Sequence, residues 1–94
     1  MRLVFAPSAR RELADALTYV AAENPVAAQK LNSTIQAAIA RILAFPSLGP
    51  RFGRGQRRVP VGGTPYLIVY RATRETVVIL RVWHGARQWP PASS

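Results

Sequence analysis

Two apolar runs in the second half of the chain constrain its fold more than any other feature. They span residues 66–70 and 77–83, and both are rich in β-branched or aromatic side chains. Runs of this length and composition, bounded by turn residues, are typical of β-strands. We therefore predict a β-hairpin with strands over 66–71 and 76–84 and a turn at 72–75.

Both faces of this hairpin are predicted to be apolar. Tyr66, Ile68 and Tyr70 alternate with Leu67 and Val69, so neither side of the strand is polar. A sheet with one face in water shows apolar and polar residues in alternation instead. We predict that helices cover one face and that a second polypeptide covers the other. The alternative is that the chain's own C-terminal residues, or a second copy of the chain, cover it.

The first half of the chain predicts a short strand and two helices. Residues 2–5 are strand-like, and Pro7 suits the first position of a helix, where its missing N–H costs nothing. The Asn24-Pro25 pair ends this helix and starts another, because asparagine caps and proline fits the first turn. Apolar residues with helical period are Ala9, Leu13, Ala16, Leu17 and Val20, and then Ala28, Leu31, Ile35, Ala38, Ile39 and Ile42. The second helix is expected to end near Phe45, which makes the pair an αα-hairpin.

The segment between the second helix and the β-hairpin is rich in turn residues. Residues 46–50 form a breaker, and residues 62–65 form a turn. Between them, 59–61 are strand-like, and Pro60 restricts that strand to a sheet edge or a bulge. The predicted fold class is therefore α+β: an N-terminal strand and a helical hairpin packed on a twisted, four-stranded antiparallel β-sheet. We expect one domain over residues 1–89 and a flexible tail over 90–94.

Composition excludes several classes of function. The chain of 94 residues has no cysteine, one histidine and four acidic residues. A disulfide scaffold, a zinc cluster and a thiol nucleophile are excluded, and ligands for a protein-bound metal are too few. We therefore expect no cofactor and no metal. No run resembles a signal peptide or a membrane span, so we expect a cytoplasmic protein without membrane contact.

The net charge of +9 is concentrated in the second half of the chain. Nine of the thirteen basic residues follow position 40, against a single acid, Glu75, whereas residues 1–40 hold four basic and three acidic residues. Arginine carries a planar fork of donors that suits carboxylates and phosphates. We predict that the sheet presents a cationic surface to an acidic partner. The alternative is a solvated surface whose arginine content reflects codon usage.

The candidate partner-binding residues are cations of this half and two ring side chains near its end. They are Arg51, Arg54, Arg57, Arg58, Arg71, Arg81, His84, Arg87 and Trp89. His84 is also the sole candidate for acid–base chemistry, because imidazole is the side chain that exchanges protons near neutral pH. A structural or partner-contact role is the favoured interpretation of His84, since it lies at a predicted strand end.

A set of short motifs extends over nearly the whole chain. It consists of Pro7-x-Ala9-x3-Leu13, Ala27-Ala28 with Ile35, Ile39 and Ile42, Pro46-x2-Gly49, Arg57-Arg58, Tyr66-x3-Tyr70-Arg71, and residues 78–87 with the ending His84-Gly85-Ala86-Arg87. Each motif is weak alone. The ordered set resembles the RelE/ParE superfamily of toxins from bacterial type II toxin–antitoxin modules, and that resemblance implies the fold described above.

The superfamily has two branches that differ in their target. RelE-like members cut mRNA on the ribosome without a metal, using a cluster of cations and a tyrosine near the C-terminus. ParE-like members lack that cluster and poison DNA gyrase. In this chain Arg57 and Arg58 stand where the ribonuclease pattern has lysines, and arginine is a poor general base because it stays protonated. Leu67 stands where the pattern has an arginine, Arg87 matches a cation, and the terminal tyrosine has no counterpart, so the chain is similar to the ParE branch.

The resemblance therefore implies a toxin that poisons DNA gyrase by protein–protein contact rather than by catalysis. It also implies a hetero-oligomer with a cognate antitoxin. From the apolar face and the arginines we infer that an acidic, amphipathic segment of the antitoxin covers the open face and pairs with the arginines. One alternative is a ribosome-dependent mRNA endonuclease, with Arg58, His84 and Arg87 as its catalytic residues. Another is a non-toxic member that binds DNA or a protein partner.

Overall fold

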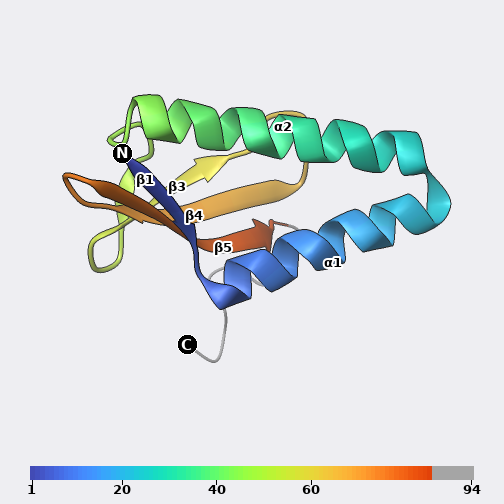
Figure 1. Cartoon of the computed structure of the whole chain (residues 1–94), viewed down its shortest axis with the longest axis horizontal. Helices are drawn as coiled ribbons and strands as arrows, with labels where there is room; N and C mark the ends of the chain where they lie inside the picture. Colours follow the sequence, from blue (N-terminus) through green and yellow to red (C-terminus); the bar gives the residue numbers. More distant parts are fainter. Residues whose placement is uncertain (86–94) are drawn as a thin grey trace.

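A helical hairpin forms the first half of the molecule (Figure 1). The computed structural model describes residues 1–85, with the side chain of Phe52 excepted; α1 spans Pro7–Glu23 and α2 spans Pro25–Ala44. Asn24 ends α1 and caps α2, because its side-chain oxygen accepts a hydrogen bond from the Ala27 amide at 3.0 Å. The predicted helices and the boundary between them are confirmed.

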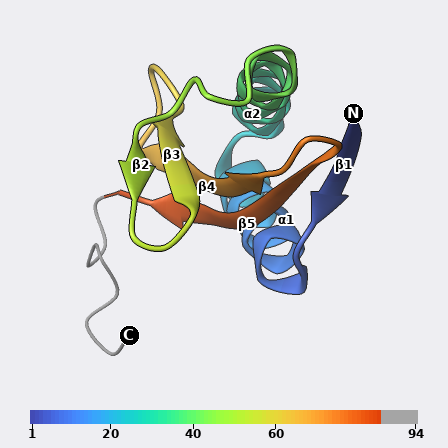
Figure 2. The ribbon, with the colours of Figure 1, turned by 90° about the vertical axis from the view of Figure 1, so that its left-hand side faces the viewer.

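The sheet has five strands in the order β1-β5-β4-β3-β2 (Figure 2). The strands are β1 Arg2–Phe5, β2 Arg51–Phe52, β3 Gln56–Pro60, β4 Tyr66–Ala72 and β5 Thr76–His84. The α+β class and the hairpin of β4 and β5 are confirmed. Two details differ from the prediction of four antiparallel strands. β2 adds a fifth strand, and β1 pairs parallel with β5 while the other pairs are antiparallel.

Pro60 lies at the end of β3, where β2 no longer pairs with it. β2 pairs with β3 only at Gln56 and Arg57, and the Arg58 amide donates to the Pro50 carbonyl at 3.2 Å. Amides two residues apart on a strand point to the same side, so the nitrogen of Pro60 points to the side of the Arg58 amide. On that side, β2 has already ended. β3 is therefore not an edge strand as a whole. Its last residue, Pro60, has no neighbouring strand on that side, so the N–H that proline lacks would have had no ladder partner there.

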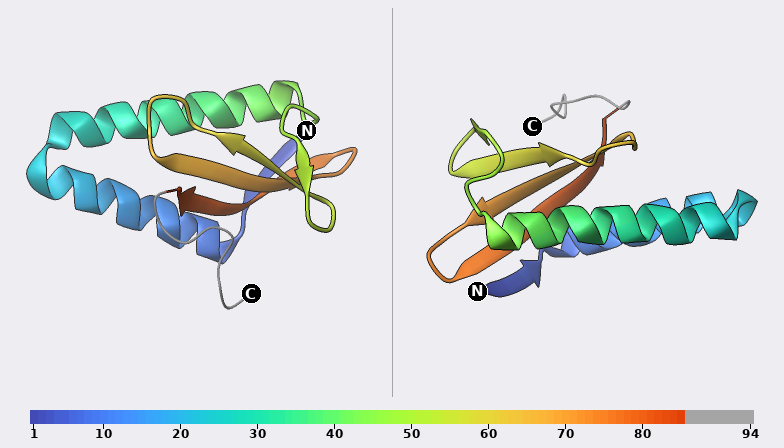
Figure 3. Two further views of the ribbon diagram at one scale, coloured as in Figure 1. Left: turned by 180° about the vertical axis from the view of Figure 1, so that it is seen from behind. Right: turned by 90° about the horizontal axis from the view of Figure 1, so that it is seen from above.

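Both helices cover the same face of the sheet (Figure 3). All six residues of the predicted α2 stripe are buried, as are Ala9 and Ala16 of α1. Sheet residues complete this core: Val59, Val61, Ile68, Tyr70, Val77, Ile79 and Val82. One continuous cluster of apolar side chains thus joins the helical hairpin to the three central strands.

The second face of the sheet is apolar, as predicted, but it is half-buried rather than open. Register places Leu67 beside Trp83 and Val69 beside Arg81 on this face. Val69 is only 2% exposed, and Leu67 and Trp83 are half-buried. The guanidinium of Arg81 lies 4.3 Å from the centre of the Trp83 ring. A cationic side chain of the chain itself therefore covers part of the indole.

The loop between α2 and β2 is fastened to the sheet by Tyr70. This side chain is fully buried, and its hydroxyl donates to the Pro46 carbonyl at 2.7 Å and accepts from the Gly49 amide at 3.0 Å. Gly49 packs so closely on β3 that a Cβ there would lie 2.4 Å from the Arg58 carbonyl oxygen. These contacts fix the point from which β2 starts.

No helix in the described part of the chain combines the length and the apolar character that a membrane crossing requires. The tail predicted over 90–94 lies outside the described residues, as do Arg87 and Trp89.

Candidate functional site

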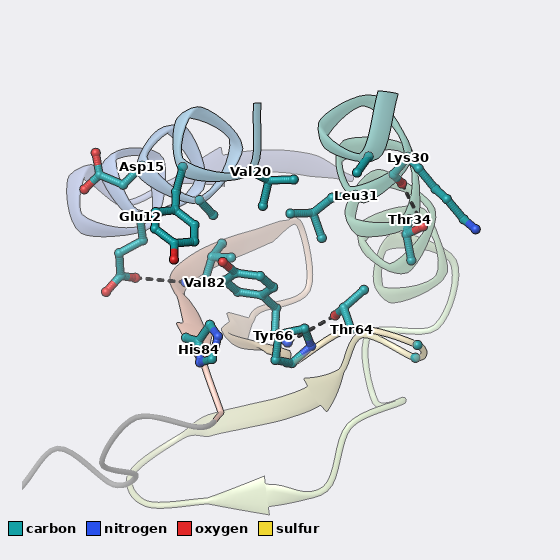
Figure 4. A pocket seen from close by; sticks show the side chains of 16 residues that line it. Glu12, Asp15, Val20, Lys30, Leu31, Thr34, Thr64, Tyr66, Val82 and His84 are labelled. Carbon is teal, nitrogen blue, oxygen red and sulfur yellow. Dashed lines mark hydrogen bonds between the residues drawn. The ribbon is translucent and has the colours of Figure 1, made fainter. Parts of the chain in front are cut away.

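A groove of about 880 Å³ opens between the helical hairpin and the end of the β-sheet (Figure 4). α1 and α2 form its walls, and the turn between β3 and β4 lies at its lower side with the end of β5. Ala16, Leu31 and Val82 are buried at its base. The groove is thus a concave apolar surface at the same end of the sheet as His84.

The rim of the groove carries polar side chains and one large, exposed aromatic side chain. Asp15 lies on the α1 side, and Lys30 and Thr34 lie on the α2 side. Tyr19 of α1 also lines the groove and is 75% exposed. Large exposed aromatic side chains beside an apolar concavity are typical of protein-binding surfaces. The groove therefore offers apolar contact on its floor and polar contact at its rim.

His84 ends β5 and lies beside Tyr66 of β4. The two rings meet edge to face, with centroids 5.1 Å apart and an interplanar angle of 80°. Tyr66 is itself fixed by the preceding turn: its amide donates to the Thr64 hydroxyl at 3.1 Å, and that hydroxyl donates to the Val61 carbonyl at 2.8 Å. Both rings line the groove, so His84 faces whatever fills it.

Arg81 is paired with Glu12 across the edge of β5. Its Nε and Nη2 both donate to the Glu12 carboxylate. The Arg81 side chain is about one-third exposed, and the Glu12 side chain is about one-quarter exposed. The same carboxylate accepts the Val82 amide at 3.0 Å. β1 pairs with β5 only as far as Ile79, so α1 supplies the acceptor that the next stretch of β5 lacks. The guanidinium predicted to bind a partner is bound within the fold.

Arg58 and Arg71 lie on the second face of the sheet. Arg58 is opposite Val69, which is opposite Arg81, so two cations flank an apolar residue in a row across three strands. Arg58 and Arg71 are exposed, and Arg71 Nη2 donates to the Arg54 carbonyl at 3.3 Å. We call Arg58, Arg71 and Arg81, with Leu67, Val69 and Trp83 between them, the cationic face. It combines charge with half-buried apolar groups.

Arg57 lies on the opposite face from its neighbour Arg58, because successive side chains of a strand alternate. It is half-buried, and its Nη1 donates to the Gly49 carbonyl at 2.8 Å and to the Ser47 carbonyl at 3.5 Å. Arg51 is opposite Arg57 on β2 and is exposed. The structure thus makes Arg57 a loop anchor and places Arg58, Arg71 and Arg81 on the cationic face, whereas Arg51 and Arg54 are exposed outside both.

The residues named for a ribonuclease are not brought together where the structure describes them. His84 shares a face of the sheet with Tyr66 and Val82, on the side of the helices, whereas Arg58 is on the cationic face. The sheet itself separates these two side chains. Among residues 1–85, no group of three or more His, Cys, Asp or Glu side chains could hold a metal ion.

The α1 wall of the groove was not identified from the sequence. Glu12, Asp15 and Tyr19 recur at intervals of three and four residues, next to the apolar stripe of the helix. An aromatic residue in an otherwise polar row is a signal that the sequence did contain. Its significance depended on the position of the β3–β4 turn, which the helix sequence does not specify.

The strand, the helical hairpin on one side of the sheet and the arginines on the other side agree with the fold that the sequence resemblance implied. The family described as "ParE toxin of type II toxin-antitoxin system, parDE" matches residues 3–89. The chain therefore belongs to the ParE toxin family of type II toxin–antitoxin systems, and the resemblance stated from the sequence motifs is confirmed.

Two relatives agree with this assignment. The chain is 30% identical over 82 residues to "Toxin RelE1" of Caulobacter vibrioides, which covers 85% of this chain and 88% of the relative. It is 32% identical over 83 residues to "Putative toxin Y4kP" of Sinorhizobium fredii, which covers 87% of this chain and 85% of the relative.

A solved structure has the same fold. It is described as "Chromosomal ParDE TA system from P. aeruginosa", and it superposes with a TM-score of 0.77 over 89% of this chain and 95% of the other. The two sequences are 19% identical. The likeness therefore concerns the arrangement of the helices and strands.

Proposed function

We propose that this chain is a growth-inhibiting toxin that poisons DNA gyrase by protein–protein contact and that a cognate antitoxin neutralises it. Membership of the ParE toxin family supports the toxin role. The cytoplasm, where gyrase works, is the location that this proposal requires. The remaining support comes from the distribution of charged side chains over the sheet.

The observation that carries the proposal is the separation of Arg58 from His84. Metal-free RNA cleavage requires a base, an acid and fixed cations around one phosphate. His84 lies on the helix side of the sheet and Arg58 on the cationic face. Two groups on opposite faces cannot act on the same phosphate. This separation supports contact with a target over catalysis on RNA.

The cationic face suits a large acidic target. Arg58 and Arg71 are exposed there, and Arg81 is held in place by Glu12. Charged groups of this kind raise association rates and specificity, while the apolar residues between them supply contact area. We assign the contact with gyrase to this face.

The groove suits an amphipathic segment of the antitoxin. Ordering a flexible segment costs several kcal/mol, so a large apolar contact is required to offset it. The groove offers Leu31 and Val82 at its base and Tyr19 at its rim. Acidic groups of such a segment can meet Lys30, which lies on the α2 side of the rim.

The test is induced expression of the full chain in cells without an antitoxin, together with a supercoiling assay on purified gyrase. We expect growth arrest, double-strand DNA breaks and intact messages. The double variant Arg58→Ala/Arg71→Ala should weaken gyrase inhibition at least tenfold. Arg41→Ala is the matched control, because Arg41 is an exposed arginine on α2, away from the cationic face, and should leave inhibition unchanged. Intact gyrase activity at growth-arresting toxin levels would refute the proposal.

A second candidate function is ribosome-dependent cleavage of mRNA. One observation favours it: a relative that covers 85% of this chain is named RelE1. In that case messages would be cut at the ribosomal A site, and Arg58→Ala would abolish cleavage. A non-toxic member would give neither breaks nor cleavage and would leave growth unaffected.

A further inference from the structure

β1 leaves one side of its backbone free. The Arg2 amide donates to the Glu75 carbonyl at 2.7 Å, and the Ala6 amide just after β1 donates to β5 at 2.9 Å. Alternate residues of a parallel strand bond to the same neighbour, so the amides of Leu3 and Phe5 point away from β5. β1 is an outermost strand, and Figure 2 draws no described element beyond it. The amides of Leu3 and Phe5 and the carbonyl of Leu3 are thus available to another strand.

The side chains along this edge are apolar and exposed. Leu3 is 38% exposed, Val4 is 39% exposed and Met1 is 58% exposed. A shallow depression adjoins them, lined by Phe5, Pro7, Arg10, Arg11 and Ala14. Hydrophobic residues on both faces of an unpaired strand are unusual, because such an edge promotes association with other chains.

The charge around the edge has one dominant sign. Arg2, Arg10 and Arg11 are all exposed, and the structure gives their side chains no hydrogen bond or ion pair within residues 1–85. Glu75 lies next to the start of β1, and its single charge is outnumbered. The first turn of α1 holds no acid, although the positive end of the helix dipole favours one. Within residues 1–85, these three arginines therefore make no hydrogen bond or ion pair that would stabilise the fold.

We propose that the free edge of β1 receives an extended acidic segment of a partner protein, which adds to the sheet as a sixth strand. Its backbone pairs with Leu3 and Phe5, its carboxylates meet Arg10 and Arg11 on the helix side of the sheet, and its apolar residues cover Val4 on the other side. Strand addition takes affinity from main-chain hydrogen bonds and specificity from alternate side chains. This surface lies at the opposite edge of the sheet from β2 and its arginines. The proposal does not depend on gyrase as the target.

An acidic peptide fits this edge better than a nucleic acid does. A phosphate backbone would satisfy the arginines, but it offers nothing to the exposed side chains of Leu3 and Val4 or to the amides of β1. A strand of alternating acidic and apolar residues turns its carboxylates toward Arg10 and Arg11 on the helix side and its apolar side chains toward Val4 on the other side, while its backbone pairs with β1.

The test uses hydrogen exchange of the full chain followed by NMR. In the free protein, the Leu3 and Phe5 amides should exchange fast, and the Val4 amide, which faces β5, should exchange slowly. The probe is an acetylated eight-residue peptide in which valine and glutamate alternate. At saturation it should slow exchange at Leu3 and Phe5 at least tenfold and change Val4 little. The same peptide N-methylated throughout is the control, because its methyl groups remove its donors and keep its backbone from approaching the edge, and it should protect neither amide.

Charge-reversal variants test the arginines. Arg10→Glu/Arg11→Glu places acids near the positive end of α1, which favours folding, and should weaken peptide binding at least fivefold. Arg51→Glu/Arg54→Glu makes the same charge change at exposed positions near the other sheet edge and should have a clearly smaller effect. If both variants lost the same amount of peptide affinity, net charge alone would explain the binding and the proposal would be overturned. The proposal would also be overturned if the peptide slowed exchange in the groove instead of β1, or in no strand at all. The same holds if a short DNA duplex slowed exchange at β1 and the peptide did not.

Discussion

At the scale of single residues, Tyr70 combines full burial with a hydroxyl that makes two hydrogen bonds. Its buried hydroxyl both donates to Pro46 and accepts from Gly49. Removing a buried hydroxyl leaves its partners without a bond and costs about 1–3 kcal/mol. We expect Tyr70→Phe to lower the free energy of unfolding by that amount in urea titrations. Tyr19→Phe, on a tyrosine that is 75% exposed, should change it by less than about 0.5 kcal/mol.

Gly49 gives a second prediction at this scale. A methyl group added to it would meet the Arg58 carbonyl oxygen at 2.4 Å, which is main chain and cannot rotate away. Overpacking of this kind costs on the order of 1–3 kcal/mol. Gly49→Ala should therefore destabilise the protein, whereas Gly62→Ala, whose new Cβ meets no atom within 4 Å, should not. Equal melting temperatures for the two variants would contradict this account of the loop.

Adjacent residues can have different roles, and Arg57 and Arg58 illustrate it. The sequence predicted a partner role for both, because they share charge and position. The pleat of β3 turns Arg57 toward the loop carbonyl of Gly49 and Arg58 toward the cationic face. The sequence shows that both residues are cationic, whereas the contact that Arg57 makes depends on a loop that folds back onto β3.

At the scale of elements, α1 completes the edge of β5 through Glu12. The carboxylate accepts from Arg81 and from the Val82 amide, so its loss would leave a strand amide without a partner. We expect Glu12→Ala to cost about 1–3 kcal/mol in unfolding free energy. Asp15→Ala, one turn further along the same helix and exposed, should cost less than about 0.5 kcal/mol. Thermal or chemical denaturation of the two variants measures the difference.

The elements also mark how far local sequence signals extend. The Asn24-Pro25 boundary and the β4–β5 hairpin were predicted because every residue that specifies them lies within a few positions. The parallel pairing of β1 with β5 was not predicted, because its partners are about 74 residues apart, as in Arg2 with Thr76. The Glu12–Arg81 pair escaped prediction for the same reason.

At the scale of the whole molecule, the groove joins both helices and the end of the sheet. Tyr19 lines it and is 75% exposed, so in the function proposed above its side chain is available to the antitoxin. We expect Tyr19→Ser to leave stability within about 0.5 kcal/mol and to weaken antitoxin binding at least tenfold by calorimetry. Val26→Ser is the matched control, since Val26 is 73% exposed and does not line the groove. Unchanged affinity in the Tyr19 variant would place the antitoxin elsewhere.

The sequence by itself determined the helices, the hairpin, the α+β class, the membership of a toxin superfamily and the excess of arginine in the second half. The helices, the hairpin and the arginine excess follow from periodicity, capping and charge, which short stretches of chain express on their own, whereas the superfamily was indicated by an ordered set of motifs that resembles it. Only the tertiary structure decided which arginine anchors a loop, which pairs with Glu12 and which faces outward, and that β1 keeps a free edge. Such facts depend on contacts between distant segments, and those contacts exist only once the core formed by α2 and the central strands has closed.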